Sequence, residues 1–332
     1  MATLKDVAKL ACVDVSTVSR ALNNPSYVHP DTKARILAAV KELSYQPNVL
    51  AQSLRQGKRH TIGVVVPRLQ LTVFAEIAQA IEEAARKRGY GVLISTTEED
   101  PKTERECLSR LRNGFSDGII IAGTGANGRL LRDIKSSGMP VVQVVRRQER
   151  DISSVVADYQ ACGYDATVFL ADKGCREIGL INGSMHIAPS QGRYKGYKKA
   201  IGQLGLPEIT SISQEEACNS YAYGYECAGR LVDENPGLDA IMVAVDVQGL
   251  GAMRALKERG LKVPEDIRVV SLTGHEIGGM LETSMTSMEI PAMEMGEKAT
   301  RMLIEEIEAP ADKKPSPQHL VFPAALAERE ST

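Results

Sequence analysis

Residues 3–23 read TLKDVAKLACVDVSTVSRALN. Thr3 and Asp6 have the spacing of a capping box, which predicts that a helix begins directly after Thr3. Asp14 is placed to cap a second helix shortly after the first one ends. Two short helices joined by so tight a turn are typical of a helix-turn-helix motif.

A third helix is expected to support this pair. Pro30 and Asp31 open it, because proline and aspartate are both favoured in the first helical turn. Its apolar residues recur at helical spacing and are expected to face the core: Ile36, Leu37, Val40 and Leu43. Cys12, in the turn between the first two helices, is expected to take a positive φ at mild cost. These elements predict an all-α head over residues 1–46.

The charge of the chain is divided unevenly. Residues 1–59 carry nine basic and four acidic side chains, whereas residues 60–332 carry 31 basic and 38 acidic ones. A small basic head on an acidic body indicates that the head meets a polyanion such as double-stranded DNA. Charge alone leaves open the alternative that the imbalance is only a chance feature of the surface.

From residue 61 onward, apolar strand-like runs alternate with amphipathic helices. Strands that are apolar throughout and separated by helices are typical of parallel sheets covered on both faces. The expected strands are 61–67, 91–95, 118–122, 139–145, 155–157, 177–181, 240–245 and 267–272. This run is too long for one comfortable sheet. We therefore expect an α/β body of two doubly wound lobes, with ligands bound beyond the carboxyl ends of the strands.

Composition argues against several other classes of protein. No apolar run approaches the ~20 residues that span a bilayer, and the charged N-terminus lacks the apolar segment of a secretory signal peptide. The six cysteines form no Cys-x-x-Cys pair and are expected to be reduced thiols in a cytoplasmic protein. The five histidines are scattered through the sequence, so we expect no metal site. We also expect no cofactor. Because no apolar run could span a bilayer, we expect no membrane partner.

The chain resembles the LacI/GalR family of bacterial transcriptional regulators over nearly its full length. The resemblance is carried by residues 3–23 and by VHPDTKARILAAVKELSYQPNVLAQSLR at 28–55. In the body it is carried by VVVPRLQLTVFAEI (64–77), SDGIIIAG (116–123), QGRYKGY (191–197) and VPEDIRVVSL (263–272). It implies two lobes of the periplasmic-binding-protein type and a homodimer that reads a palindromic operator. It further implies a non-enzymatic repressor of a sugar-utilisation operon, controlled by a small molecule between the lobes.

The family motif implies which side chains of the second helix meet DNA. Val15, Ser16 and Arg20 are expected to face the bases in the major groove. Arg20 is suited to guanine O6 and N7, and Val15 to a thymine methyl group. The hydroxyls of Thr17 and Ser19 suit phosphates, with helix packing or capping as the alternative.

Residues 47–55 resemble the hinge helix of the family. Nine residues are too few for a stable isolated helix, so this segment is expected to fold on DNA, paired with its dimer mate. Leu54 matches the family's minor-groove wedge, and Ala51 belongs to the same DNA-contacting segment. A plain linker with an ordinary leucine is the alternative. The expected division of the chain is then head 1–46, hinge and linker 47–59, and two-lobed body 60–332.

Residues 123–128 read GTGANG, a literal Gly-x-Gly-x-x-Gly between a strand and a helix. A dinucleotide-binding enzyme is therefore a rival hypothesis. The motif follows the third strand rather than the first, and the next strand region, 142–147, ends in no acidic residue. A flexible turn beside the cleft is the favoured interpretation. A periplasmic sugar-binding protein would share the lobes but would need a signal peptide.

The resemblance also implies an effector site. Arg193 matches the arginine with which family members bind effector, and a structural ion pair is its alternative role. Asp158 stands at the crossover between the lobes, and Phe74 is expected to form an apolar wall of the cleft. Asp246 either meets the effector or only caps a helix. Thr273 stands where family members commonly carry a carboxylate. A carboxylate would offer two acceptor oxygens to sugar hydroxyls, whereas Thr273 offers a single hydroxyl.

Arg68 directly follows the first strand, near a helix N-terminus, which is a position suited to an anion. The Pro-Arg-Leu run at 67–69 looks similar to sucrose- and trehalose-operon repressors. A basic, carboxylate-poor cleft favours a sugar phosphate over a neutral sugar, and an exposed Arg68 without a ligand is the alternative. The tail after Phe322 lacks heptads, so no tetramer through a C-terminal coiled coil is expected.

Overall fold

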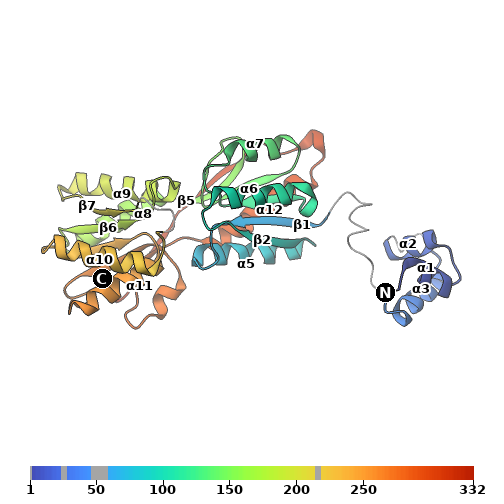
Figure 1. Cartoon of the computed structure of the whole chain (residues 1–332), viewed down its shortest axis with the longest axis horizontal. Coiled ribbons are helices and arrows are strands. Elements are labelled where there is room, and N and C mark those ends of the chain that lie inside the picture. The colour runs from blue at the N-terminus through green and yellow to red at the C-terminus, as the bar shows by residue number, and fades with distance from the viewer. Residues whose placement is uncertain (1, 24–27, 46–58, 214–217) are drawn as a thin grey trace. The chain divides into compact units, whose positions relative to one another are not determined.

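The computed structural model describes residues 2–23, 28–45, 59–213 and 218–332. The chain forms two compact units, residues 1–59 and residues 60–332 (Figure 1). The predictions for Ala51, Leu54 and the hinge helix fall outside the described residues. Within the described part, no helix is both long enough and apolar enough to cross a membrane.

The described residues of the first unit form three helices: α1 (Leu4–Leu10), α2 (Val15–Asn23) and α3 (Pro30–Glu42). Thr3 and Asp6 form the capping box that the sequence predicts, because each side chain accepts a hydrogen bond from the backbone of the other residue. The turn after α1 needs one left-handed residue, and Cys12 supplies it with a φ of 50°. The helix-turn-helix prediction is confirmed.

The core of this head joins one apolar face of each helix. Val7, Val18 and Ile36 are fully buried within it. The prediction for Leu37 was wrong: its side chain is 48% exposed. The buried residues of α3 are Ile36 and Ala39, and Leu37 is rotated by about 100° from Ile36, toward the solvent-facing side.

The first lobe of residues 60–332 contains six parallel strands in the order β11-β5-β4-β3-β1-β2. The strands are β1 (Thr61–Val66), β2 (Gly91–Thr96), β3 (Gly118–Ile121), β4 (Val141–Val144), β5 (Ser153–Ala157) and β11 (His319–Phe322). The helices on its faces are α5 (Thr72–Lys87), α6 (Pro101–Arg110), α7 (Gly128–Ser136) and α12 (Ala292–Glu308) (Figure 1). Short helical turns follow α6 and α12: η2 (Leu111–Phe115) and η4 (Ala311–Lys313).

The second lobe contains six strands in the order β12-β10-β9-β8-β6-β7, all parallel except β12 against β10. The strands are β6 (Ile178–Asn182), β7 (Ile209–Ile212), β8 (Ala240–Val243), β9 (Arg268–Gly274), β10 (Thr286–Glu289) and β12 (Ala325–Ala327). Its helices are α8 (Tyr159–Asp172), α9 (Ala188–Leu204), α10 (Tyr221–Glu234), α11 (Asp246–Glu258) and the short η3 (Glu276–Met280).

The two lobes share one topology. In the first lobe β2-β1-β3-β4-β5 lie in that order, and in the second lobe β7-β6-β8-β9-β10 repeat it. This is a doubly wound order in which the strand sequence reverses beside the first strand, and ligands bind at the carboxyl ends of strands next to that point. The predicted fold class of an all-α head with two doubly wound lobes is confirmed.

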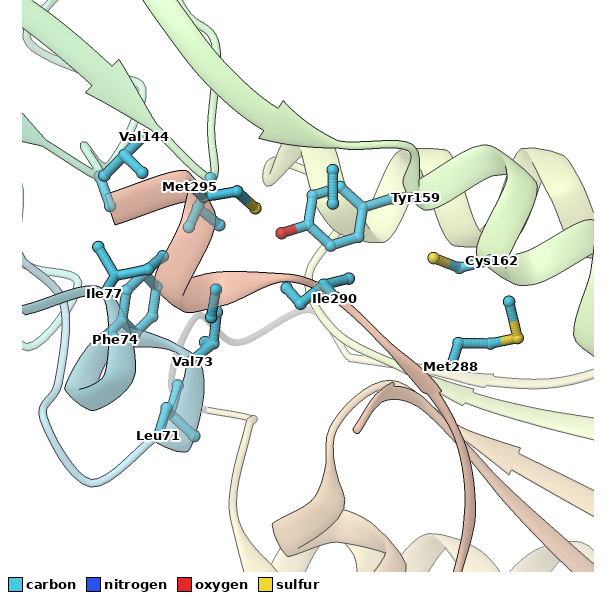
Figure 2. Packing of buried hydrophobic residues seen from close by; sticks show 14 of the residues in the cluster. Leu71, Val73, Phe74, Ile77, Val144, Tyr159, Cys162, Met288, Ile290 and Met295 are labelled. Carbon is cyan, nitrogen blue, oxygen red and sulfur yellow. The ribbon is translucent and has the colours of Figure 1, made fainter. Parts of the chain in front are cut away.

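One cluster of buried apolar residues extends through both lobes. Phe74 of α5 and Val144 of β4 belong to it in the first lobe, and Leu180 and Leu272 belong to it in the second. Figure 2 shows how Tyr159, at the start of α8, extends its ring toward Met295 and Ile290 beside the segment that enters α12. The lobes therefore share apolar packing at the place where the chain passes between them.

Candidate functional site

The exposed face of α2 is the first candidate site. Val15, Ser16 and Arg20 are exposed, whereas Val18 and Ala21 on the same helix are buried in the head core. Residues at i, i+1 and i+5 lie on one side of a helix, so the three side chains predicted to read bases share one solvent-facing surface. Thr17 and Ser19 are partly buried at its border.

The second candidate site lies between the lobes. Two small adjoining cavities, each of about 30 Å³, share the lining residues Leu71, Val73, Val245 and Thr273. Both lie where β8 and β9 end and where α5 begins. Four of the predicted effector residues line these cavities: Phe74, Arg193, Asp246 and Thr273. A volume of this size holds a water molecule rather than a sugar, so the cleft as it stands is closed.

Arg193 is buried between the lobes although it carries a charge. It is 5% exposed, and its Nη2 donates to Thr273 Oγ1 at 2.5 Å. Its guanidinium carbon lies 5.0 Å from the centre of the Tyr159 ring, and among the described residues its Nε has no hydrogen-bond partner. Burial lowers the pKa of Arg193, because removing the guanidinium from water disfavours its charged form. Burial raises the pKa of Tyr159 to about 12, so this phenol stays neutral.

A second arginine in the cleft was missed by sequence analysis. Arg146 lines the same cavity as Arg193 and lies 5.9 Å from the Phe74 ring. It forms a bidentate ion pair with Glu99, with N–O distances of 2.6 and 2.7 Å, and both side chains are 6% exposed. The signal that could have found Arg146 is its place directly after the apolar run 139–145. Val145 takes a φ of 65° there, which is strained for a β-branched residue and turns the chain after β4.

Asp246 and His275 line the cavity that does not contain Arg193. Oδ2 of Asp246 accepts the backbone N–H of His275 at 3.0 Å, and burial raises the pKa of this carboxyl. Nδ1 of His275 lies 2.9 Å from Oε2 of Glu76. Glu76 belongs to α5 of the first lobe and His275 follows β9 of the second, so this pair joins the two lobes directly. Neither Glu76 nor His275 was predicted as a site residue.

The structure places two predicted effector residues outside the cavities. Arg68 forms an ion pair with Glu98, with its Nε 2.7 Å from Oε2, and it does not line either cavity. Asp158 caps α8 by accepting the backbone N–H of Ala161 at 2.9 Å. Asp158 lines a separate surface hollow instead, together with Lys199. Both side chains are thus engaged in local contacts, which the sequence alone does not reveal.

The turn at residues 123–128 is held by a carboxylate from α6. Glu104 is fully buried and accepts hydrogen bonds from the Thr124 backbone N–H at 2.6 Å and from the Asn127 amide at 2.9 Å. The Thr124 N–H stands where a dinucleotide fingerprint would offer a backbone donor to a phosphate. Because a carboxylate of the chain itself already accepts this hydrogen bond, the turn does not fit a dinucleotide.

A larger hollow of about 470 Å³ lies on the surface of the second lobe, along α11. Leu250, Arg254 and Lys257 line it together with Leu281. It contains none of the predicted effector residues, and it is open to solvent rather than enclosed between the lobes. We therefore take the interlobe cavities as the candidate ligand site.

Comparisons with known proteins agree with this architecture. Residues 3–48 match the model of the bacterial regulatory proteins of the lacI family. Residues 59–330 match the model of periplasmic binding proteins and the sugar binding domain of the LacI family. The chain belongs to the LacI family.

Individual members of the LacI family resemble it over their whole length. The ribose operon repressor of Halalkalibacterium halodurans is 32% identical, with 100% of this chain and 97% of that protein covered. A lac repressor dimer bound to operator and the anti-inducer ONPF is 25% identical, with a TM-score of 0.87 over 100% and 99% of the two chains. A complex of the transcriptional regulator CelR with cellobiose is 28% identical, with a TM-score of 0.75 over 100% of both chains. This LacI-family chain is therefore a DNA-binding transcriptional regulator.

The Glu76–His275 contact gives a prediction about cleft closure. Glu76→Ala is expected to weaken the closed state by about 1 kcal/mol, the net contribution of one hydrogen bond, which is a factor of about five in the ratio of closed to open molecules. Small-angle scattering of the full chain should then show a larger radius of gyration. Glu82→Ala is the matched control, because it removes only the pair with Arg86 within α5. An unchanged scattering curve for Glu76→Ala would show that this pair does not hold the lobes together.

Proposed function

We propose that this protein is a repressor of a sugar-utilisation operon, bound to its operator as a homodimer and controlled by a small sugar or sugar phosphate between the lobes. The observation that carries the proposal is the presence, in one chain, of an exposed face on α2 and of small cavities between two lobes, lined by apolar residues together with a few polar side chains. The lac repressor structure, a dimer bound to operator, supports the assembly, and the CelR–cellobiose complex supports a sugar ligand.

The proposed DNA contacts follow from the exposed face of α2. Val15, Ser16 and Arg20 read base edges in the major groove, while Thr17 and Ser19 position the helix on phosphates. In the segment that joins head and body, Ala51 and Leu54 lie in the minor groove of a kinked base step. Residues 1–46 then form the reading head, 47–59 the hinge and linker, and 60–332 the effector and dimerisation body.

An exposed sheet edge supports the proposal of a homodimer. β2 is the terminal strand of the first sheet, so one side of its backbone has no neighbouring strand within that sheet. Leu93 and Ile94 of β2 are 36% and 40% exposed, although consecutive residues point to opposite faces. Apolar edge strands left open in this way associate with other chains unless they are covered. Packing against a second copy of this chain covers the edge.

We further propose that the protein performs no catalysis and acts in the cytoplasm, where an operator is accessible. Similar proteins include a ribose operon repressor and the transcriptional repressor PurR. One interlobe cavity is lined by two arginines, a tyrosine and a threonine, and the other by Asp246 and His275. The turn that resembles a dinucleotide motif is held by Glu104. Nothing in this proposal requires a cofactor or a metal.

The experiment that tests the DNA proposal compares operator with random DNA at one fixed salt concentration. Arg20→Ala is expected to cost about 1–3 kcal/mol of operator binding and to relax discrimination at one base pair of each half-site. Leu54→Ala is expected to reduce operator affinity while leaving binding to random DNA unchanged, because the wedge acts only on a kinkable step. Affinities measured by fluorescence anisotropy on operators with single base changes decide this. An unaltered base preference in Arg20→Ala excludes it as a reader.

A further inference from the structure

A contact between two ionisable side chains joins the lobes across the cleft. Nδ1 of His275, which follows β9 of the second lobe, lies 2.9 Å from Oε2 of Glu76 in α5 of the first. The two side chains are 4% and 30% exposed, respectively. When the lobes separate, Glu76 moves away with the first lobe and both groups return to water. The pair therefore belongs to the closed form of the cleft.

The geometry of this contact determines where a further proton binds. An ionised carboxylate only accepts hydrogen bonds, so Nδ1 of His275 carries a hydrogen and donates it to Glu76. The proton that charges the imidazole then binds at Nε2. His275 lines a cavity of about 30 Å³, which is large enough for the one water molecule that an N–H at Nε2 needs as its acceptor. The imidazole thus takes up a proton without leaving Glu76.

Further charged side chains lie on the elements packed around this pair: Asp246 of α11, Glu276 of η3, Glu289 of β10, Arg193 of α9 and Arg329 after β12. Arg329 is paired with Glu289, Arg193 donates to the Thr273 hydroxyl, and Glu276 is exposed. Asp246 accepts the His275 backbone N–H at 3.0 Å. Burial raises the pKa of Asp246, and a charge on His275 lowers it again. Because Asp246 and His275 belong to the same lobe, closing the cleft adds only Glu76 to these charges.

Closing the cleft changes the surroundings of His275 in two opposing ways. Loss of water disfavours the charged imidazole. The carboxylate of Glu76 favours it, because a charge on the donor adds Coulomb attraction to a hydrogen bond that the neutral ring already makes. The Glu76 side chain keeps 30% of its surface in solvent, so pairing removes only part of its hydration. The attraction is therefore gained at a reduced desolvation cost.

We propose that His275 and Glu76 form a pH-sensitive latch between the lobes, which is closed more often in mildly acidic than in mildly alkaline solution. An ordinary imidazole changes its charge between pH 5 and 8. Because the closed form binds the proton more tightly than the open form, lowering the pH shifts the population toward closure, and raising the pH reverses the shift. A ligand that binds only the closed form then gains apparent affinity at lower pH, even where the ligand itself does not titrate.

Small-angle scattering of the full chain at about pH 8 and about pH 6, at constant ionic strength, tests the latch. On acidification the ratio of closed to open molecules is expected to rise about three- to fivefold, the range of a partly exposed ion pair, so the radius of gyration falls. His275→Gln keeps an amide donor for Glu76 but takes up no proton. Glu76→Gln keeps an acceptor for Nδ1–H but has no charge. Both variants are expected to lose the response to pH.

Glu82→Gln is the matched control, because it removes from the same helix a carboxylate whose partner is Arg86 of α5 itself. It is expected to respond to pH as the wild type does, and circular dichroism verifies that each variant is folded. A constant radius of gyration in the wild type, or a wild-type response in His275→Gln or Glu76→Gln, overturns the proposal. The measurement uses neither DNA nor effector, so its failure leaves the proposed function intact.

Discussion

Glu99→Gln is expected to lower the free energy of unfolding of residues 60–332 by about 3–5 kcal/mol. Glu99 and Arg146 are each 6% exposed and form two short hydrogen bonds. Removing one charge leaves the other buried without its partner, and that loss exceeds what the intact pair contributes to stability. Urea denaturation of the full chain, followed at the transition of the body, measures the change.

The neighbouring residue supplies the control for this prediction. Glu98 also pairs with an arginine, Arg68, but Glu98 is 62% exposed. Glu98 and Glu99 share the left-handed backbone conformation, with φ values of 52° and 63°, so backbone strain is matched. Glu98→Gln should cost about 0–1 kcal/mol, because exposed ion pairs contribute little. Equal losses for the two variants would contradict the account of a buried pair at the cleft.

Gly196→Ala is expected to destabilise the second lobe by about 3 kcal/mol, at the upper end of the usual cost of overpacking. A Cβ atom at Gly196 of α9 would lie 2.0 Å from the Gln160 carbonyl oxygen and 2.6 Å from the Tyr164 nitrogen, both in the backbone of α8. Backbone atoms cannot rotate away, so the two helices must separate. Because Arg193 lies one turn earlier on α9, effector binding should weaken as well.

Another glycine of the same helix is the control. Apart from its own stretch of α9, no heavy atom of the described residues lies within 4 Å of the position that a Cβ of Gly202 would take, and its φ is not in the left-handed region. Gly202→Ala should therefore raise stability by about 0.5–1 kcal/mol, through the higher helix propensity of alanine. Chemical denaturation of both variants decides the matter. A mild effect of Gly196→Ala would mean that α8 and α9 are not packed as closely as described.

Local sequence signals account for much of the fold. The capping box at Thr3 and the proline at the start of α3 act within a few residues, and runs such as 61–67 are apolar enough to mark buried parallel strands. The strands that sequence analysis missed were β7, β10, β11 and β12. They are three or four residues long, and β11 and β12 find their partners far away in the chain. Pairing of that kind leaves no periodic pattern in the sequence.

The candidate site was predictable only in part. Phe74, Arg193, Asp246 and Thr273 line the cavities, and their contact with an effector stays a prediction. The roles of Arg68 and Asp158 depend on a neighbour, Glu98 for one and the first turn of α8 for the other, and only the folded chain reveals these contacts. The same holds for Arg146, whose partner Glu99 lies 47 residues away along the chain.

The central claim is that one ligand between the lobes controls how the head reads DNA. An effector shifts DNA affinity only if it binds the DNA-competent and incompetent states unequally, and a shift of about 100-fold needs roughly 2.7 kcal/mol of such a difference. The measurement is the affinity of the full chain for a palindrome selected from random DNA, with and without a sugar or sugar phosphate found to raise the melting temperature of the chain, at fixed salt. We predict binding to the palindrome about 10³-fold tighter than to random DNA, and a ligand-dependent change of at least about tenfold that is lost in Arg193→Ala. Equal affinity for palindrome and random DNA, or the same ligand response in Arg193→Ala as in the wild type, would contradict the account.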